Sequence, residues 1–283
     1  MRVFAEEFIK IYDPTIGESE PWYINDHTIV FADGEWHLFG ITHAEPGSPL
    51  EETLCAHAVT KDLLHTPFTK CAYPFHADPN YKEKHFWAPH IILHDGLYYM
   101  FYCGGSLEGS DKYRIHLATS TDLLNWQRHP ENPMVIDGFD ARDPMILRVG
   151  EEWVMYYTCT SAPTGGNHCV AALTSRDLIH WGNKRIVFKS EIQGTIAGPC
   201  ESPFAEKVGS TYFLFIGPYG GYDTAYCDTA VYASSDPFSF GGDPVGRIPA
   251  HACEILKIED RHYITHCGWG QGGVYISPLH FEL

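Results

Sequence analysis

One carboxylate in this chain occupies a context that suits acid–base chemistry. Glu201 lies between Cys200 and Ser202-Pro203, directly before the aromatic, alternating segment that ends in TYFLF. Alternation of this kind is typical of a buried strand. Desolvation by the neighbouring Pro and Cys side chains favours the neutral form of a carboxyl group. We therefore expect Glu201 to hold a proton at neutral pH.

Two further carboxylates, Asp26 and Asp143, precede other apolar segments of the chain. Their neighbours Asn25, His27 and Arg142 are polar, so we expect both carboxylates to be ionised. One protonated acid beside an ionised carboxylate is the arrangement that cleaves glycosidic bonds.

Each acid alone also has a structural explanation. Asp26 could cap a turn, Asp143 could pair with Arg142, and Glu201 could be an exposed loop acid. The catalytic interpretation therefore depends on the elements that bring the three carboxylates together.

The chain contains five related segments that supply such elements. Each opens with a polar or small turn, continues as a short strand, makes a tight turn and ends in a strand rich in aromatic residues; the segments are 25–40, 87–102, 142–157, 201–216 and 251–266. Gly-containing turns between alternating apolar runs predict hairpins. Matching positions are separated by 62, 55, 59 and 50 residues and are occupied by Asp26, Ala88, Asp143, Ser202 and Ala252.

A second pattern follows the first four segments. A strand runs into a turn led by Asp at 58–66, 117–126, 172–181 and 232–240. Units of about 40–60 residues with four strands each indicate the blades of a β-propeller. We predict an all-β, five-bladed β-propeller with four-stranded antiparallel blades around a central channel. It forms one domain, 1–283, with blades starting near 25, 87, 142, 201 and 251, and the first 20 residues complete the last blade.

In a propeller the innermost strands start at one shared mouth, so equivalent repeat positions converge. The residues just before the matching positions are Asn25, Trp87, Arg142, Glu201 and His251. Asp26, Asp143 and Glu201 should therefore meet at this mouth, with Trp87 as a wall that stacks on sugar. We predict substrate contacts from Asn25, His27, Trp87, Arg142, His251, His266 and Trp269.

Bulk composition excludes several partners. The chain has 19 basic and 36 acidic residues, a net charge of −17, which disfavours nucleic acid and anionic membranes. Nine scattered cysteines without a CxxC pair are typical of reduced, buried thiols. The N-terminus lacks the pattern of a signal peptide, and no apolar run reaches the length of a membrane helix, so we expect a cytoplasmic protein.

The whole chain resembles the five-bladed propeller glycoside hydrolases, the superfamily that includes families 43, 62, 32 and 68. The resemblance rests on Asp26, on Trp87-Ala88-Pro89, on Asp143, on Glu201-Ser202-Pro203 and on the repeated TSxDLxxW segments. By comparison with family 43, it implies that Asp26 is the general base, that Asp143 orients the acid and tunes its pKa, and that Glu201 is the general acid. By comparison with family 32, Asp26 would instead be a nucleophile.

The motifs match neither family fully. His27 follows Asp26, where family 43 usually has Pro, whereas Arg142-Asp143-Pro144 matches family 32. Family 32 enzymes normally add a C-terminal β-sandwich, and this chain ends at Leu283, where the propeller is complete. We therefore favour a family-43-like inverting enzyme and keep a retaining, family-32-like enzyme as the alternative.

We predict an exo-acting glycoside hydrolase that removes terminal arabinofuranose or xylose from short oligosaccharides. The alternatives are a retaining β-fructofuranosidase-like hydrolase and a carbohydrate-binding propeller without catalysis. Phosphorolysis needs a basic cluster at the mouth, and the candidates are Arg142 with Arg114 and Lys112 near it. No cofactor is required and no metal-ligand spacing such as HExxH occurs. Some relatives hold a calcium ion near a fifth-blade His, and the resemblance makes His266 the candidate here.

Overall fold

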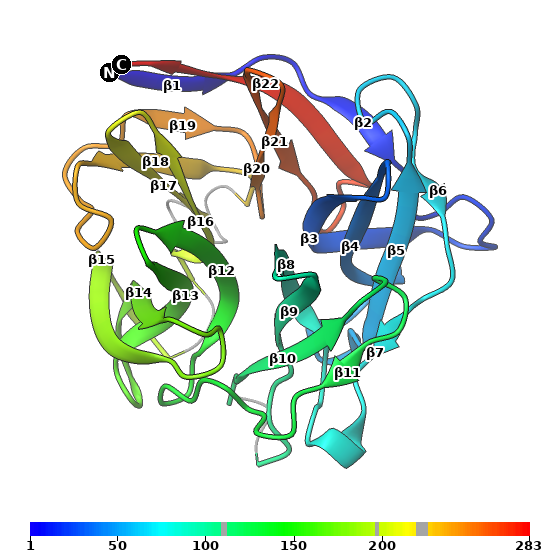
Figure 1. Ribbon diagram of the computed structural model, residues 1–283, viewed down its shortest axis with the longest axis horizontal. Helices are drawn as coiled ribbons and strands as arrows, with labels where there is room; N and C mark the ends of the chain where they lie inside the picture. The colour runs from blue at the N-terminus through cyan, green and yellow to red at the C-terminus, as the bar shows by residue number, and fades with distance from the viewer. Residues whose placement is uncertain (109–111, 196–197, 219–225) are drawn as a thin grey trace.

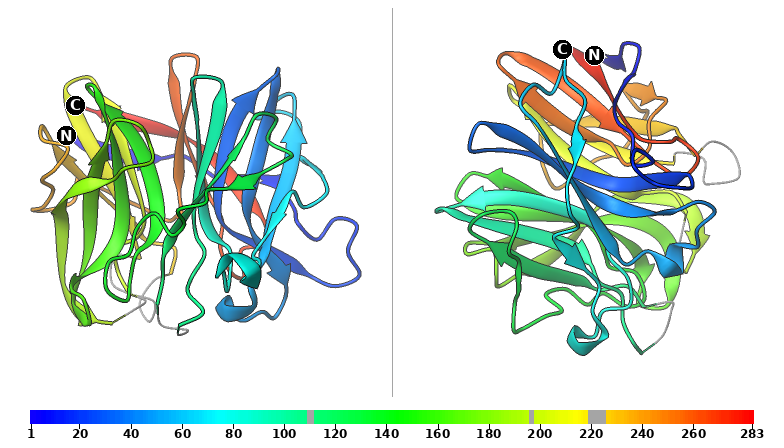
Figure 2. Two further views of the ribbon diagram at one scale, coloured as in Figure 1. Left: turned by 60° about the horizontal axis from the view of Figure 1, so that its bottom comes forward. Right: turned by 90° about the vertical axis from the view of Figure 1, so that its right-hand side faces the viewer.

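The computed structural model describes residues 1–108, 112–195, 198–218 and 226–283. Five antiparallel sheets surround a central axis, as predicted (Figure 1). Figure 2 shows the same sheets from the side, with their strands running between the two ends of the molecule. The short 3-10 helices η1 (Pro49–Glu51) and η2 (Pro79–Tyr81) lie in connections. None of the helices in these ranges has the length and apolar character needed to cross a membrane.

Each blade runs from an inner strand to an outer one. The first blade consists of β3 (Trp22–Ala32), β4 (Glu35–Ala44), β5 (Leu54–Thr60) and β6 (Thr69–Lys70), and β7 (Phe75–His76) also pairs with β5. The second consists of β8 (Trp87–His94), β9 (Leu97–Cys103), β10 (Ile115–Ser120) and β11 (Gln127–Arg128), and the third of β12 (Arg142–Val149), β13 (Glu152–Ala162), β14 (Gly165–Ser175) and β15 (Gly182–Gly194). The fourth consists of β16 (Glu201–Val208), β17 (Thr211–Gly217), β18 (Thr229–Ser234) and β19 (Gly246–Ile248), and the fifth of β20 (Glu254–Ile258), β21 (Arg261–His266) and β22 (Val274–Glu282), together with β1 (Arg2–Ala5) and β2 (Ile9–Tyr12).

The N-terminal strands complete the fifth blade. β1 and β2 both pair with β22, and Arg2 lies opposite Glu282, so the two chain ends are adjacent (Figure 1). β1 also reaches the fourth blade, because the Val3 N–H donates to the Val245 carbonyl at 2.9 Å. This strand therefore covers the edge between two blades and closes the ring.

A backbone irregularity marks the five matching repeat positions. Each has a positive φ angle, between 32° and 54°; the residues are Asp26, Ala88, Asp143, Ser202 and Ala252. In the first four blades the strand register shifts at the same place. Such bulges redirect side chains out of the regular strand alternation. They turn two successive side chains toward the mouth, where a regular strand would present only one.

The remaining local predictions are also confirmed. Three of the four Asp-led turns have an Asp side chain that accepts backbone N–H groups two and three residues ahead, at Asp62, Asp122 and Asp177. In the fourth turn Asp236 accepts the N–H of Phe238. All nine cysteines are free, and seven of them are buried.

Candidate active site

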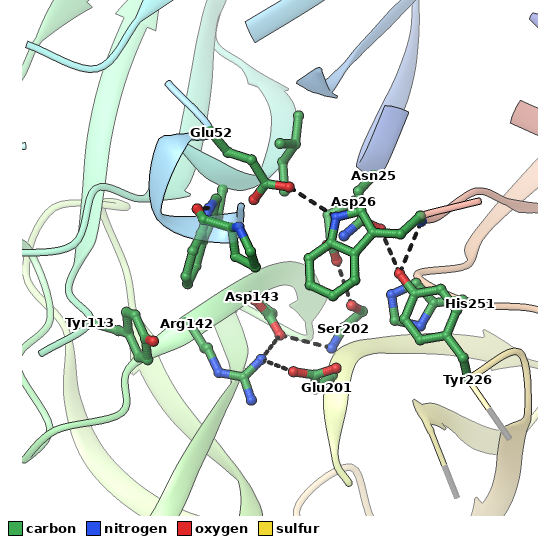
Figure 3. A pocket seen from close by; sticks show the side chains of 14 residues that line it. Asn25, Asp26, Glu52, Tyr113, Arg142, Asp143, Glu201, Ser202, Tyr226 and His251 are labelled. Atoms are coloured by element: carbon green, nitrogen blue, oxygen red, sulfur yellow. Dashed lines mark hydrogen bonds and ion pairs between the residues drawn. The ribbon is translucent and has the colours of Figure 1, made fainter. Parts of the chain in front are cut away.

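A cavity of about 250 Å³ opens at the mouth of the propeller, and all five blades contribute to its wall (Figure 3). The residue before each bulge lines it, as the repeat predicted; these are Asn25, Trp87, Arg142, Glu201 and His251. Asp26, Asp143 and Ser202 lie beside them. The three predicted carboxylates, drawn from the first, third and fourth blades, therefore meet in one cavity.

Arg142 holds the acidic cluster together. Its Nη1 donates to Asp143 Oδ2 at 2.9 Å and to Glu201 Oε1 at 2.6 Å, and its Nε donates to Asp140 Oδ1 at 2.9 Å. All four side chains are buried. Charge-assisted bonds in a dry site fix side-chain geometry strongly, so Arg142 orients both Asp143 and Glu201.

Ser202 connects the first blade to this network. Its hydroxyl donates to Asp26 Oδ1 at 2.5 Å, and its backbone N–H donates to Asp143 Oδ2 at 3.0 Å. The positive φ of Ser202 places both donors on the cavity side. One residue thus fixes the distance between two carboxylates that are 117 positions apart in the chain.

The protonation expected from the sequence needs correction. Asp26 was expected to be ionised, but burial and the neighbouring charges of Asp143, Glu201 and Glu52 raise its pKa well above the ordinary value, although the Ser202 hydroxyl lowers it. Glu201 was expected to be neutral, and this stays a prediction; its Oε1 accepts from Arg142 Nη1 at 2.6 Å, a contact with another blade that its sequence neighbours did not indicate. The expectation for Asp26 considered sequence neighbours alone, whereas burial in the cavity wall and carboxylates of other blades raise its pKa.

Aromatic rings form one side of the cavity. Trp87 lies in the wall, as predicted; its indole N–H donates to the Pro49 carbonyl at 3.0 Å, and its ring stacks on His85 with centroids 3.7 Å apart. Tyr226 stacks on His251 at 3.9 Å and lies parallel to the ring of Trp269 at 5.9 Å. Flat, partly exposed rings of this kind suit the apolar faces of sugars.

Two predicted contact residues lie outside the cavity. His27 is buried between the first and fifth blades, 2.7 Å from Thr265 Oγ1 and 3.1 Å from Cys267 Sγ, and burial lowers its pKa to about 3. His266 stacks on Tyr275. After the bulge at Asp26, the next side chain returns to the strand alternation and faces away from the mouth, which is why adjacency in sequence misled the prediction.

Several cavity residues were missed by the sequence analysis. They are Ile41, Pro49, Glu52, Tyr113 and Tyr226, and Ser202 was noted only as a repeat position. All five lie outside the inner strands. Four of them, Pro49, Glu52, Tyr113 and Tyr226, lie in connections that have no counterpart in the repeat, so no periodic signal could identify them.

The two basic residues expected near Arg142, Arg114 and Lys112, do not line the cavity with it. Arg114 donates to the carbonyls of Tyr113 and Gly138, and Lys112 pairs with Glu108. Among the described residues, Arg142 is the only Lys or Arg that lines the cavity.

No three His, Cys, Asp or Glu side chains in the described ranges come together as a metal site. A calcium ion near His266 therefore stays a prediction that no cluster of protein ligands supports.

Comparisons with known proteins agree with this architecture. Residues 18–236 match the family described as the glycosyl hydrolases family 32 N-terminal domain. The levanase of Bacillus sp. (strain L7) is 28% identical in an alignment that covers 60% of this chain and 19% of the levanase.

Two solved structures show the same fold. The Bombyx mori GH32 β-fructofuranosidase BmSUC1 superposes with a TM-score of 0.73 at 17% identity, over 97% of this chain and 62% of that one. The Cellvibrio cellulosa α-L-arabinanase complexed with arabinohexaose gives 0.71 at 15% identity, over 93% and 94%. This chain thus spans less than two thirds of the levanase and of the β-fructofuranosidase.

Proposed function

This chain belongs to glycosyl hydrolase family 32, through its N-terminal domain, and from that premise we propose that it hydrolyses a terminal glycosidic bond in the cavity at the propeller mouth. The observation that carries the proposal is the meeting of Asp26, Asp143 and Glu201 in one cavity around Arg142. Paired carboxylates on either side of a bond are the machinery of glycoside hydrolysis.

We propose a retaining mechanism. The Asp26 carboxylate attacks the anomeric carbon while Glu201 donates a proton to the departing oxygen. Water then releases the sugar from Asp26, with Glu201 accepting the proton of that water. Asp143 and Arg142 orient the two reacting groups through the bonds described above.

The proton needed for this step has a source in the free site. Burial and the nearby charges of Asp143 and Glu201 raise the pKa of Asp26 well above its ordinary value, so we propose that the buried carboxylate cluster supplies this proton. In the reactive complex this proton must be on Glu201, with Asp26 ionised. A sugar that approaches Asp26 with its electron-poor anomeric carbon favours that redistribution.

The family match favours the retaining alternative over the inverting pentosidase that the sequence motifs favoured. A β-fructofuranoside is therefore the substrate that we propose first, and terminal arabinofuranosides and xylosides are the second candidates. The arabinanase likeness, at 15% identity, supports the fold alone.

The size and charge of the cavity support action on chain ends of neutral sugars. Its volume of about 250 Å³ lies below the range of roughly 300–1,000 Å³ that ligand sites usually occupy. Asp26, Glu52, Asp143 and Glu201 face it together with one cation, Arg142. This balance disfavours phosphorylated or anionic sugars, and it disfavours phosphate as the attacking group.

Stereochemistry of the product tests the mechanism. The protein is assayed against sucrose, levan and inulin oligosaccharides and aryl pentosides, and the best substrate is then cleaved in aqueous methanol. We expect a methyl glycoside of retained configuration by 13C NMR. An inverted product would make Asp26 a base and return the pentosidase prediction to first place.

A second comparison separates an enzyme from a binding module. Glu201→Gln should abolish turnover while sugar binding, measured by calorimetry, persists. If the unaltered protein binds oligosaccharides and releases no sugar from any of them, the carbohydrate-binding alternative is correct and the hydrolase proposal is wrong.

A further inference from the structure

Glu52 is a fourth carboxylate in the cavity, and the mechanism above does not use it. It directly follows helix η1 in the connection between β4 and β5, so it stands on the rim of the first blade. Its exposed fraction is 1%, yet it lines the cavity opposite the acidic cluster (Figure 3). Glu51, its neighbour, is exposed to solvent.

One oxygen of Glu52 is fixed by two donors. Oε1 accepts the Tyr23 hydroxyl at 2.6 Å and the Trp269 indole N–H at 3.0 Å. These donors come from the first and fifth blades, so they define the orientation of the carboxylate from two sides.

Within the described residues, the side-chain hydrogen bonds of Glu52 end on Oε1, and none within 3.5 Å ends on Oε2. The indole N–H of Trp87 lies close enough to stabilise the charge of Glu52 and so to lower its pKa. That N–H donates to the Pro49 carbonyl. Oε2 is not among the fully enclosed polar atoms that lack a partner, so it faces the open space of the cavity. An unpaired acceptor at the wall of a cavity is suited to a donor that arrives with a ligand.

The surroundings of Glu52 indicate which kind of ligand group would donate a hydrogen bond to Oε2. Glu52 shares the cavity wall with Trp87 and Trp269, whose rings provide flat apolar surfaces. Its charge contributes to raising the pKa of Asp26. Burial raises the pKa of Glu52 itself to about 7. A neutral hydroxyl donor fits this place, because it pairs with the carboxylate and places an apolar sugar face against the rings.

We propose that Glu52 is a specificity-determining residue whose Oε2 accepts a hydrogen bond from a hydroxyl group of the terminal sugar, away from the bond that is cleaved. This inference rests on the proposed glycoside hydrolysis and assigns the residue that selects the substrate there. Tyr23 is a positioning residue, because its hydroxyl holds Oε1 and thereby aims Oε2 into the cavity.

The test compares the unaltered protein, Glu52→Gln, Tyr23→Phe and the control Glu51→Gln on the best substrate and on its monodeoxy analogues. We expect Glu52→Gln to lower kcat/KM roughly 10- to 100-fold on the parent sugar, the value of a hydrogen bond to a charged group. On one deoxy analogue the loss should shrink to the part that the change at Asp26 causes. Tyr23→Phe should lower kcat/KM less than Glu52→Gln does, and Glu51→Gln should leave kcat/KM unchanged.

The deoxy comparison is needed because loss of the Glu52 charge also changes Asp26. That effect acts on every substrate alike, whereas loss of a hydroxyl contact disappears only when that hydroxyl is absent. An equal loss on every analogue, or no loss on the parent sugar, would overturn the proposal.

Binding separates this inference from the proposed function. If the protein binds a sugar without cleaving it, the same comparison is made with dissociation constants measured by calorimetry, and the hydrolase proposal alone fails. If it neither binds nor cleaves any sugar of the panel, both proposals fail.

Discussion

At the scale of single residues, the buried carboxylates link catalysis to stability. Burial and three neighbouring carboxylates raise the pKa of Asp26 above its ordinary value of 3.8. A carboxyl group with a raised pKa in the folded state binds its proton more tightly than in the unfolded chain. The folded state therefore becomes less stable relative to the unfolded chain as the pH rises from about 3.8 through the folded-state pKa.

Asp26→Asn should remove this penalty together with the reacting group. We expect kcat to fall by roughly 10⁴-fold or more. We also expect the variant to be more stable than the unaltered protein at pH 7–8, because the asparagine side chain has no charge to bury. The advantage should vanish near pH 3, and calorimetric melting across this range measures it. A constant difference at every pH would contradict the assignment.

Arg142 stabilises the folded protein, whereas the buried charge of Asp26 destabilises it. The guanidinium of Arg142 forms ion pairs with three buried carboxylates. Arg142→Met leaves them without a counter-charge, and removing one partner of a buried ion pair typically costs about 3–5 kcal/mol. We expect a loss of this size in denaturant unfolding at neutral pH. The control Arg176→Met, at a side chain that is 80% exposed, should change stability by less than about 0.5 kcal/mol.

At the scale of elements, the repeat determined how much the sequence could predict. All five matching positions have a positive φ angle, because the innermost strand of every blade needs the same irregularity where it opens at the mouth. Glu52 and Tyr226 escaped prediction, since they lie in connections that differ between blades. His27 was misplaced because residues adjacent in sequence were treated as adjacent in the site.

The β1 strand offers a prediction at this scale. A Cβ atom on Gly246 of β19 would lie too close to the Val3 carbonyl oxygen, so a side chain there displaces β1 from the edge of the fourth blade. Gly246→Ala should cost about 1–3 kcal/mol, as overpacking usually does. Gly241→Ala, where nothing lies within 4 Å, is the matched control and should leave the melting temperature nearly unchanged. If Gly246→Ala and Gly241→Ala changed stability equally, the close approach of β1 to Gly246 would not contribute to the stability of the ring.

At the scale of the whole molecule, closure of the ring should make the blades unfold together. Inner strands of neighbouring blades pack on one another, and β1 joins the first residues of the chain to the last strand and to the fourth blade. A blade that leaves the ring exposes the apolar faces of both neighbours, so partial unfolding is unfavourable. We therefore expect one cooperative calorimetric transition, in agreement with the predicted single domain.

Deleting residues 1–7 tests this coupling, because it removes β1 and leaves the outer edges of β22 and β19 unpaired. Unpaired edges also favour association between molecules. We expect a lower melting temperature, a single transition that remains sharp, and concentration-dependent association in sedimentation. If the shortened protein instead melted in two steps, with the fifth blade unfolding first, the blades would be separate cooperative units and the single-domain prediction would be wrong.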